Sequence, residues 1–301
     1  MRITPGEMNA NLLDYLAQTQ EAVQQSQQRI SSGLKVQAPS DDPQNAARLL
    51  QFDSQLSADV QYQKNISAAA QSLNASLAGM GQLEQQLSQA KSLMVEASST
   101  ASPTKNSALV VQMDAILNNA LGTANTMNGS QAVFAGTATG AAPFTATLGP
   151  DAEGVQRVQA VAYNGNAGAL SYEISPGSSV VGTISGQELF APGAGGVFET
   201  LIAARQAIDS GASLSSLQDT MDSLLGKVQQ LQARLGAAVS SLGQSANANQ
   251  AEQLNLKSER SAIQDTDIAA ESIAMTQKQT SYQATLQVIA KIGKVSLMDY
   301  L

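Results

Sequence analysis

The sequence predicts a mainly α-helical protein in which helical segments from both ends of the chain pair into a long coiled-coil rod, with a small inserted antiparallel β domain. Apolar residues recur at every seventh position near both ends of the chain, which is the repeat of a coiled coil. Aromatic residues make up only 4% of the composition, so the cores must be narrow seams of aliphatic side chains. Between the helical parts lie short alternating runs separated by Gly and Pro, which is typical of antiparallel strands.

The first predicted helix covers residues 9–32 and carries one narrow apolar stripe on a polar surface. The stripe consists of Leu12, Leu16, Val23 and Ile30. Gly33 fits the left-handed position that ends a helix, and Leu34 can then fold back as the hydrophobic contact of a Schellman motif. Because a helix with so little apolar surface is marginal in water, we expect it to be stable only when it is packed.

The second predicted helix begins at Pro43 and continues to Ser98. Proline suits the first position of a helix, and Asp42 before it can cap the free N–H groups. A helix of this length cannot be one side of a compact domain, so it needs a partner of similar length. Its seven-residue repeat consists of Ile66, Leu73, Met80, Leu87 and Met94.

The partner is predicted in residues 214–242, where apolar residues alternate steps of three and four, the spacing of a coiled-coil seam. A shorter amphipathic helix is expected over residues 109–127. The seam residues are Leu214, Leu217, Met221, Leu224, Val228, Leu231, Leu235 and Leu242.

The last predicted helix begins near Asp265 or Asp267 and runs toward Leu297. Residues 244–249 before it are polar enough for a bend or a solvated helical stretch. Its apolar stripe consists of Ile268, Met275, Tyr282 and Ile289, with Ile292 beside it.

The β segment is predicted from alternating runs at residues 155–163 and 170–174, with turn signals at residues 164–165 and 176–177. The helical seams lie outside this segment, so we expect deletion of residues 140–186 to leave assembly intact. The chain then divides into three parts. They are a terminal helical assembly domain (residues 1–42 and 243–301), a helical rod domain (43–132 and 197–242) and an inserted β domain (133–196).

Composition argues against catalysis and metal binding. The chain has no His and no Cys, the side chains on which most metal sites and most nucleophilic chemistry at neutral pH depend. Asp41 and Asp42 form a carboxylate pair, but no further ligand lies at a motif spacing, so we interpret them as turn and capping residues. We therefore expect a protein that is not an enzyme, with no catalytic residue, cofactor or metal.

Charge and targeting signals point to protein partners. The formal net charge of −8 opposes binding to nucleic acid or to an anionic membrane surface. The N-terminus lacks the apolar region of a secretory signal peptide, and no 18-residue apolar run is present that could span a membrane. We expect export, where it occurs, to use another route.

The terminal stripes are the candidate assembly interface. The residues are Leu12, Leu16, Val23 and Ile30 near the N-terminus, and Ile268, Met275, Tyr282, Ile289 and Ile292 near the C-terminus. They could pack as a two-helix hairpin within one chain, but such a hairpin still exposes an edge of its seam. We therefore favour burial between subunits, with each terminal stripe lacking a partner in the monomer.

Several motifs resemble the flagellin superfamily over the whole chain, and within it the hook–filament junction proteins. The run from Ile30 to Val36, followed by residues 39–43, is similar to the N-terminal signature of the family. The junction branch is favoured over filament flagellin by the Ser-Asp-Asp-Pro sequence at residues 40–43 and by the ending Asp299-Tyr300-Leu301. The patterns at residues 133–137, 163–165 and 174–177 also resemble the β domain of that branch.

The resemblance implies a secreted structural subunit of the bacterial flagellum, exported through the flagellar type III apparatus. Implied partners are further copies in a ring, the first hook-associated protein, flagellin and an export chaperone. Filament flagellin is the nearest alternative. An enzyme or adhesin acting through the β segment is an alternative of another class, and it would require a polar pocket or an exposed binding patch there.

Overall fold

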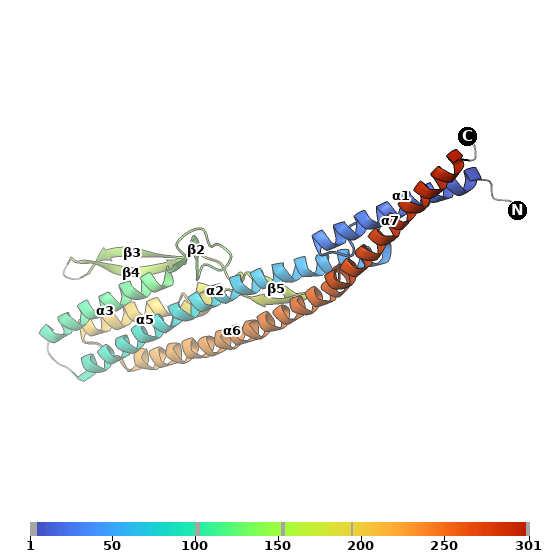
Figure 1. The fold of residues 1–301 in the computed structure, drawn as a ribbon. Coiled ribbons are helices and arrows are strands. Elements are labelled where there is room, and N and C mark those ends of the chain that lie inside the picture. The colour runs from blue at the N-terminus through green and yellow to red at the C-terminus, as the bar shows by residue number, and fades with distance from the viewer. Residues whose placement is uncertain (1–4, 100–102, 152–153, 194, 299–301) are drawn as a thin grey trace. The chain divides into compact units, whose positions relative to one another are not determined.

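The computed structural model describes residues 5–99, 103–151, 154–193 and 195–298, and within them the chain is mainly helical (Figure 1). The predicted fold class, long helices with a small antiparallel β region, is confirmed. The helices are α1 (Pro5–Ser32), α2 (Pro43–Ser99), α3 (Pro103–Ala124), α4 (Gly186–Phe190), α5 (Val197–Ser210), α6 (Ser215–Gln264) and α7 (Ile268–Met298). The strands are β1 (Met127–Asn128), β2 (Gln131–Ala132), β3 (Phe144–Pro150), β4 (Gln156–Tyr163), β5 (Ser171–Ser175) and β6 (Ser178–Val181).

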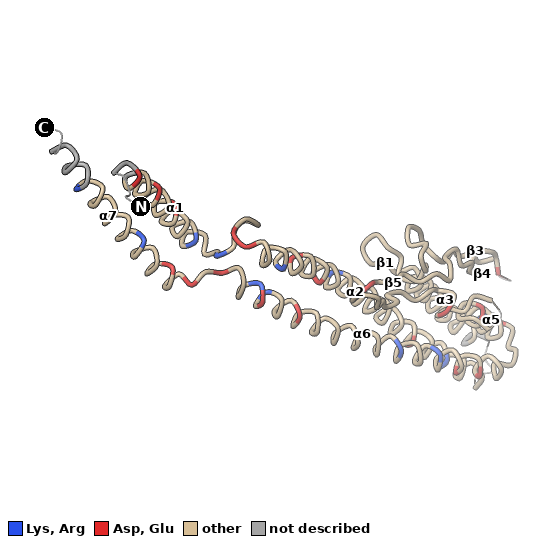
Figure 2. The backbone as a smooth tube through the Cα atoms, turned by 90° about the vertical axis from the view of Figure 1, so that its right-hand side faces the viewer, with Lys and Arg blue, Asp and Glu red and all other residues tan. Residues whose placement is uncertain are grey.

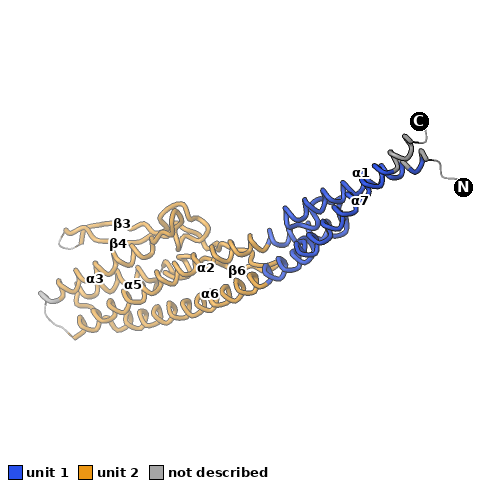
Figure 3. Tube along the Cα trace, viewed as in Figure 1, with its two compact units in different colours: residues 1–58, 252–301 blue, residues 59–251 orange. Residues whose placement is uncertain are grey.

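The chain divides into two compact units (Figure 3). Unit 1 consists of residues 1–58 and 252–301, and unit 2 consists of residues 59–251. The division falls within α2 and within α6, so each of these helices contributes to both units. The three-part division made from the sequence stays a prediction.

In unit 2 the predicted seven-residue repeat of α2 is the buried edge of that helix. The five repeat residues of α2, from Ile66 to Met94, are each at most 2% exposed. The α6 seam residues from Met221 to Leu242 are buried as well, whereas Leu217, nearer the start of α6, is half-buried. The Glu84 carboxylate accepts hydrogen bonds from Gln229 Nε2 at 2.8 Å and from Gln232 Nε2 at 3.1 Å. Further along α2, Lys91 pairs with Asp222. Residue numbers rise on α2 as they fall on α6, so the two helices are antiparallel partners.

The β region of unit 2 consists of three separate two-stranded antiparallel sheets. The longest pairs β3 with β4, from Phe144 opposite Tyr163 to Pro150 opposite Gln156, with a bulge after Thr147. The β5–β6 turn contains Gly177 at φ 71°, a conformation that glycine adopts without strain. The sequence predicted this region, although β1 and β2 begin before residue 133.

Four phenylalanines form the centre of a core that the strands and the helices share. The ring centroids of Phe134 and Phe190 lie 5.6 Å apart, and those of Phe144 and Phe198 lie 5.3 Å apart. These residues belong to one continuous cluster with the buried residues of α2, α3, α5 and α6. Removing the β region would take Phe144 out of this shared core, so the packing conflicts with our expectation that the region is dispensable.

Some helix boundaries differ from the predictions. Residues 244–249 are helical within α6, which ends at Gln264, so the helical stretch is confirmed for this segment and the bend, its alternative, was wrong. The short helix α3 begins at Pro103 and ends at Ala124, earlier than predicted at both ends. Helix α5 was not recognised as a separate helix, because Gly211, which ends it at φ 70°, was not used as a stop signal.

Candidate assembly interface

Unit 1 contains two helix breaks, between α1 and α2 and between α6 and α7. At the first, Gly33 has φ 72° and donates its N–H to the Arg29 carbonyl at 2.9 Å. Leu34 N–H donates instead to the Ser32 hydroxyl at 3.2 Å. The cap is therefore the simpler left-handed motif with a single backbone bond, and the predicted Schellman pattern was wrong.

Backbone hydrogen bonds join the two breaks to each other. Lys35 N–H donates to the Gln264 carbonyl at 2.6 Å, and Thr266 N–H donates to the Gly33 carbonyl at 2.9 Å. Between these bonds, Leu34 and Asp265 form an antiparallel bridge. We call this arrangement the backbone staple, and it fixes where α1 ends relative to where α7 begins.

The acidic residues at the breaks cap backbone N–H groups. Asp41 Oδ2 accepts from the N–H groups of Gln37 and Ala38, both at 2.9 Å, and the Ala38 bond is the main cause that lowers the pKa of the Asp41 carboxyl. Asp42 Oδ1 accepts from Asn45 N–H at 3.0 Å, which lowers the pKa of Asp42, and Pro43 is the first residue of α2. Both carboxylates accept hydrogen bonds from backbone N–H groups of their own chain, so their role is structural.

Helices α1 and α7 pack along each other in antiparallel directions (Figure 1). The expectation that the terminal stripes lack a partner within the monomer is therefore wrong. Ile268 is 54% exposed, and the side chain of Ile292 lies outside the described residues. The other predicted interface residues are half-buried: Leu12, Leu16, Val23, Ile30, Met275, Tyr282 and Ile289.

The most buried positions of this pair are polar. Over the described side chains of α1 and α7, only Ser26 and Thr285 are buried, at 0% and 7% exposure. Lys278 reaches the same seam, where its Nζ donates to Ser26 Oγ at 2.6 Å and lies 3.7 Å from Glu271 Oε1. The pair thus has no fully buried apolar core among these residues.

Large apolar side chains also face outward from the pair, and the sequence analysis missed them. Their exposed fractions run from 41% to 62%, which leaves substantial apolar surface in water. They are offset from the seven-residue repeat on which the prediction relied, so the repeat alone could not find them. The residues are Met8, Leu13, Tyr15, Ile273, Leu286 and Val288.

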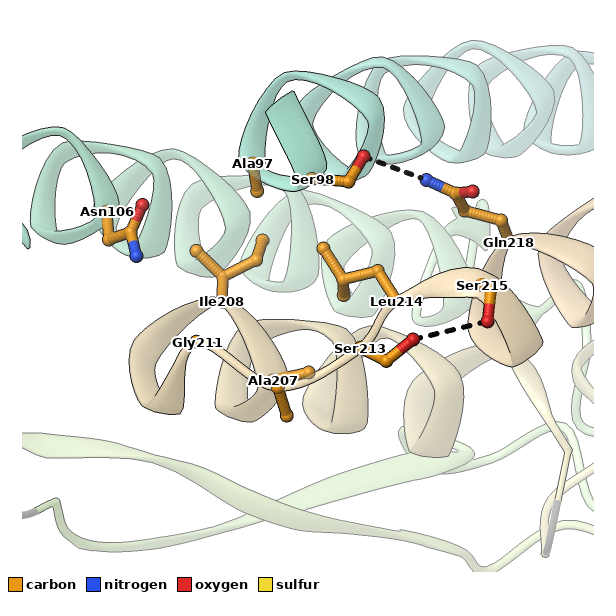
Figure 4. A pocket seen from close by; sticks show the side chains of 11 residues that line it. Ala97, Ser98, Asn106, Ala207, Ile208, Gly211, Ser213, Leu214, Ser215 and Gln218 are labelled. Atoms are coloured by element: carbon orange, nitrogen blue, oxygen red, sulfur yellow. Dashed lines mark hydrogen bonds between the residues drawn. The ribbon is translucent and has the colours of Figure 1, made fainter. Parts of the chain in front are cut away.

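The described residues offer little for chemistry. They contain no group of three His, Cys, Asp or Glu side chains placed to hold a metal ion, and no helix among them has the length and apolarity to cross a membrane. A cavity of about 670 Å³ lies at one end of unit 2, where Gln218 bonds to Ser98 (Figure 4). None of the described side chains that line it is ionisable. Acidic and basic residues are interspersed along α6 (Figure 2), so this helix offers no basic stripe for a polyanion.

Comparison with protein families identifies both helical parts. Residues 6–139 match the bacterial flagellin N-terminal helical region, and residues 218–301 match the bacterial flagellin C-terminal helical region. The chain belongs to the bacterial flagellin family. The two matches include α1, most of α6 and all of α7, so the terminal pair and the staple are parts of the family's helical regions. No curated protein matches the chain significantly.

Solved structures share the fold at low sequence identity. A Vibrio parahaemolyticus protein described as a candidate flagellar hook-associated protein has a TM-score of 0.64 and 16% identity, and the match covers 75% of this chain and 100% of that one. Flagellar hook-associated protein 3 of Legionella pneumophila has a TM-score of 0.59 and 13% identity, with 69% and 97% covered. The flagellar junction protein FlgL of Legionella pneumophila has a TM-score of 0.56 and 14% identity, with 73% and 100% covered. At these identities the likeness establishes the fold.

Proposed function

We propose that this protein is a structural subunit of the bacterial flagellum that forms the junction between the hook and the flagellin filament. It assembles through the α1–α7 pair, which packs against the same pair in neighbouring copies. It acts as an adaptor between the first hook-associated protein and flagellin.

The observation that carries this proposal is that the α1–α7 pair buries polar side chains and leaves large apolar side chains exposed. Its most buried side chains are Ser26 and Thr285, while Leu13 and Ile273 are 54% and 62% exposed. A folded monomer gains little from such an arrangement, because apolar surface in water contributes no hydrophobic stabilisation. In a tube of subunits the outward residues become buried, and the pair then forms part of a continuous apolar layer.

Sequence details support the junction position over the filament position. Residues 40–43 have the Ser-Asp-Asp-Pro form that is similar to the junction branch, and the ending Asp299-Tyr300-Leu301 resembles that branch as well. Similar solved structures include proteins named as hook-associated protein 3 and as a junction protein. A filament flagellin remains the alternative.

The partners follow from this position. They are further copies of the chain in a ring, the first hook-associated protein on one side, flagellin on the other, and an export chaperone before secretion.

Electron microscopy of a strain that lacks the gene tests the proposal. We expect intact hooks without filaments, together with unassembled flagellin in the culture medium, and restoration by the full-length gene. Immunogold labelling of the complemented strain should mark one position between hook and filament. Labelling along the whole filament would instead identify the chain as a filament flagellin.

A further inference from the structure

The chain contains two Asn-Gly pairs, Asn128-Gly129 and Asn164-Gly165, and both lie in the β region of unit 2. In such a pair the glycine has no Cβ, so its backbone nitrogen can approach the side-chain carbonyl carbon of the asparagine before it. A nucleophile and an electrophilic carbon that are held next to each other react as an intramolecular pair. The amino-acid sequence presents the two pairs alike, whereas the structure distinguishes them.

The Asn128-Gly129 pair lies in the tight turn between β1 and β2. Asn128 is paired with Gln131, so Gly129 and Ser130 form a two-residue hairpin loop. Gly129 is exposed and has φ 63° at the first central position, which is the pattern of a type II′ turn. Each strand is only two residues long, and so short a ladder restrains the turn weakly.

The reacting groups of this turn are unobstructed. Nothing lies within 4 Å of the position that a Cβ on Gly129 would take. No hydrogen bond joins the Asn128 side chain to another residue in the described part of the chain. The Asn128 amide can therefore rotate toward the Gly129 nitrogen, and water can reach the exposed glycine.

The Asn164-Gly165 pair, by contrast, is held on both sides. Asn164 Nδ2 donates to the Thr145 hydroxyl at 2.7 Å, and Asn164 N–H donates to the Pro143 carbonyl at 2.7 Å. Gly165 packs against Tyr163, since an added Cβ would lie 2.5 Å from the tyrosine ring. Rotating the Asn164 amide toward Gly165 would break its bond to Thr145, so the same reaction is hindered here.

We propose that the turn between β1 and β2 is a site of self-modification, at which Asn128 deamidates in the folded protein while Asn164 is protected. The substrate is the protein's own backbone and side chain, and the co-reactant is water, with hydroxide as the base. Since nothing else is consumed, the modified fraction rises with the age of the molecule. This inference goes beyond the proposed function and stands whether or not the chain occupies the hook–filament junction.

The reaction proceeds through a cyclic imide. Hydroxide takes the proton of the Gly129 N–H, and the electron pair of the nitrogen attacks Asn128 Cγ. The N–Cγ bond forms, the Cγ–Nδ2 bond breaks, and Nδ2 leaves as ammonia with a proton from water. Water then opens the succinimide ring at either of its carbonyl carbons, which gives aspartate or isoaspartate. Overall, the amide and a water molecule become a carboxylate and ammonium.

Either product alters the hairpin. Aspartate adds a negative charge to a chain of net charge −8, and isoaspartate also lengthens the backbone by an additional carbon atom within a two-residue loop. At the base of the hairpin, Val133 N–H donates to the Thr126 carbonyl at 3.0 Å, and the fully buried Phe134 follows directly. In the isoaspartate form the Val133 amide proton should exchange faster with solvent, because the longer loop no longer fits the register of the ladder.

Ageing of the purified full-length protein in mildly alkaline buffer tests the proposal. Peptide mapping by mass spectrometry follows each asparagine, and fragmentation that distinguishes isoaspartate from aspartate identifies the product. We expect Asn128 to deamidate at least about tenfold faster than Asn164 in the folded protein. In concentrated urea the two rates should converge, because unfolding removes the Thr145 bond and the Tyr163 contact.

Two variants separate the reactive turn from the protected one. Thr145→Val removes the acceptor that holds the Asn164 side chain, so it should raise the Asn164 rate about fivefold and leave the Asn128 rate unchanged. Asn128→Ser removes the reactive amide, so it should abolish the modification at this turn and keep Val133 exchange constant during ageing. Circular dichroism before ageing checks that each variant is folded.

Two results would overturn the proposal. If Asn128 and Asn164 deamidate at equal rates in the folded protein, the fold does not select the turn between β1 and β2. If Thr145→Val leaves the Asn164 rate as in the parent, the Thr145 bond is not the protecting contact. Neither measurement depends on where the chain sits in the flagellum, so failure of this inference is distinguishable from failure of the proposed function.

Discussion

Arg205 on α5 donates a hydrogen bond from Nη1 to Asp114 Oδ1 on α3 at 3.0 Å, and it is the most deeply buried charged residue of unit 2 described here, at 3% exposure. The same Nη1 donates to the Val158 carbonyl on β4 at 2.9 Å. Asp114 also pairs with Arg157 on β4, which pairs in turn with Asp151. The hydrogen bond that Arg157 Nε donates to the Asp151 carboxylate is the main cause that raises the pKa of Arg157. Charge pairing thus attaches the β3–β4 hairpin to two helices.

Asp114→Ala should destabilise unit 2 strongly. It leaves Arg205 and Arg157 without a shared carboxylate, and breaking a buried ion pair from one side costs about 3–5 kcal/mol. Denaturant unfolding at neutral pH measures the change. Asp222→Ala is the control, because it breaks the exposed pair with Lys91 and should cost at most about 1 kcal/mol. Equal losses in the two variants would contradict a structural role for the buried network.

Two glycines of α2 should respond in opposite ways to the same substitution. A Cβ on Gly79 would lie 2.9 Å from the ring of Phe134, which is fully buried, whereas a Cβ on Gly81 meets nothing within 4 Å. Gly81→Ala should stabilise the protein by about 0.5–1 kcal/mol, because alanine favours a helix. Gly79→Ala should destabilise it by roughly 1–3 kcal/mol through overpacking. Thermal melting of both variants measures the difference. A rise in Tm for Gly79→Ala would show that Phe134 has room to move.

The sequence predicted the helices well because their signals are local. Pro43 and Gly33 lie at helix ends as expected, and the repeat from Ile66 to Met94 is buried. The shared aromatic core was not predictable in the same way. Phe134, Phe144, Phe190 and Phe198 come from four separate segments, and no periodicity connects them.

The seam between α1 and α7 was predicted in part, because a seven-residue repeat identifies the side of a helix that faces its partner, whereas the interface between subunits stays a prediction. It does not reveal which positions approach most closely, and here these are Ser26 and Thr285. Small polar residues in a seam give no signal in a search for apolar repeats. Outward residues such as Leu13 and Ile273 have no periodic partner in the sequence, so only the packing of α1 on α7 identifies them.

The loop at residues 37–42 should change in acid. Backbone N–H groups of Ala38 and Gln37 lower the pKa of Asp41 below its ordinary value of 3.8. A lowered pKa means that the carboxylate stabilises the folded loop above pH 3.8 and that this contribution is lost as the pH falls through the lowered value. In NMR titrations the amide proton shifts of residues 37 and 38 should move together with a midpoint below 3.8. Asp41→Ala should abolish that transition, and a midpoint at or above 3.8 would contradict the capping role.

The decisive prediction compares an outward residue of α7 with a seam residue of the same helix. Ile273 is 62% exposed, whereas Ile289 is half-buried in the seam with α1. Ile273→Asp should leave the thermal melting of the monomer unchanged, because its side chain is already in water. In an assembled tube the same carboxylate would be buried without a partner, at a cost of roughly several kcal/mol in each subunit. Secretion should therefore persist while motility and filament number fall sharply.

Ile289→Asp should differ by acting on the monomer as well. Its carboxylate would face α1, so we expect loss of helix content in the terminal pair together with failed assembly. Gln277→Asp, an exposed change of equal charge on the same helix, is the control and should leave melting and motility unchanged. The measurements are circular dichroism of purified monomers, and swimming assays with filament counts in cells shown to secrete each variant. Normal filaments in cells carrying Ile273→Asp would show that the outward apolar residues are not at an interface, and assembly would then depend on other surfaces of the chain.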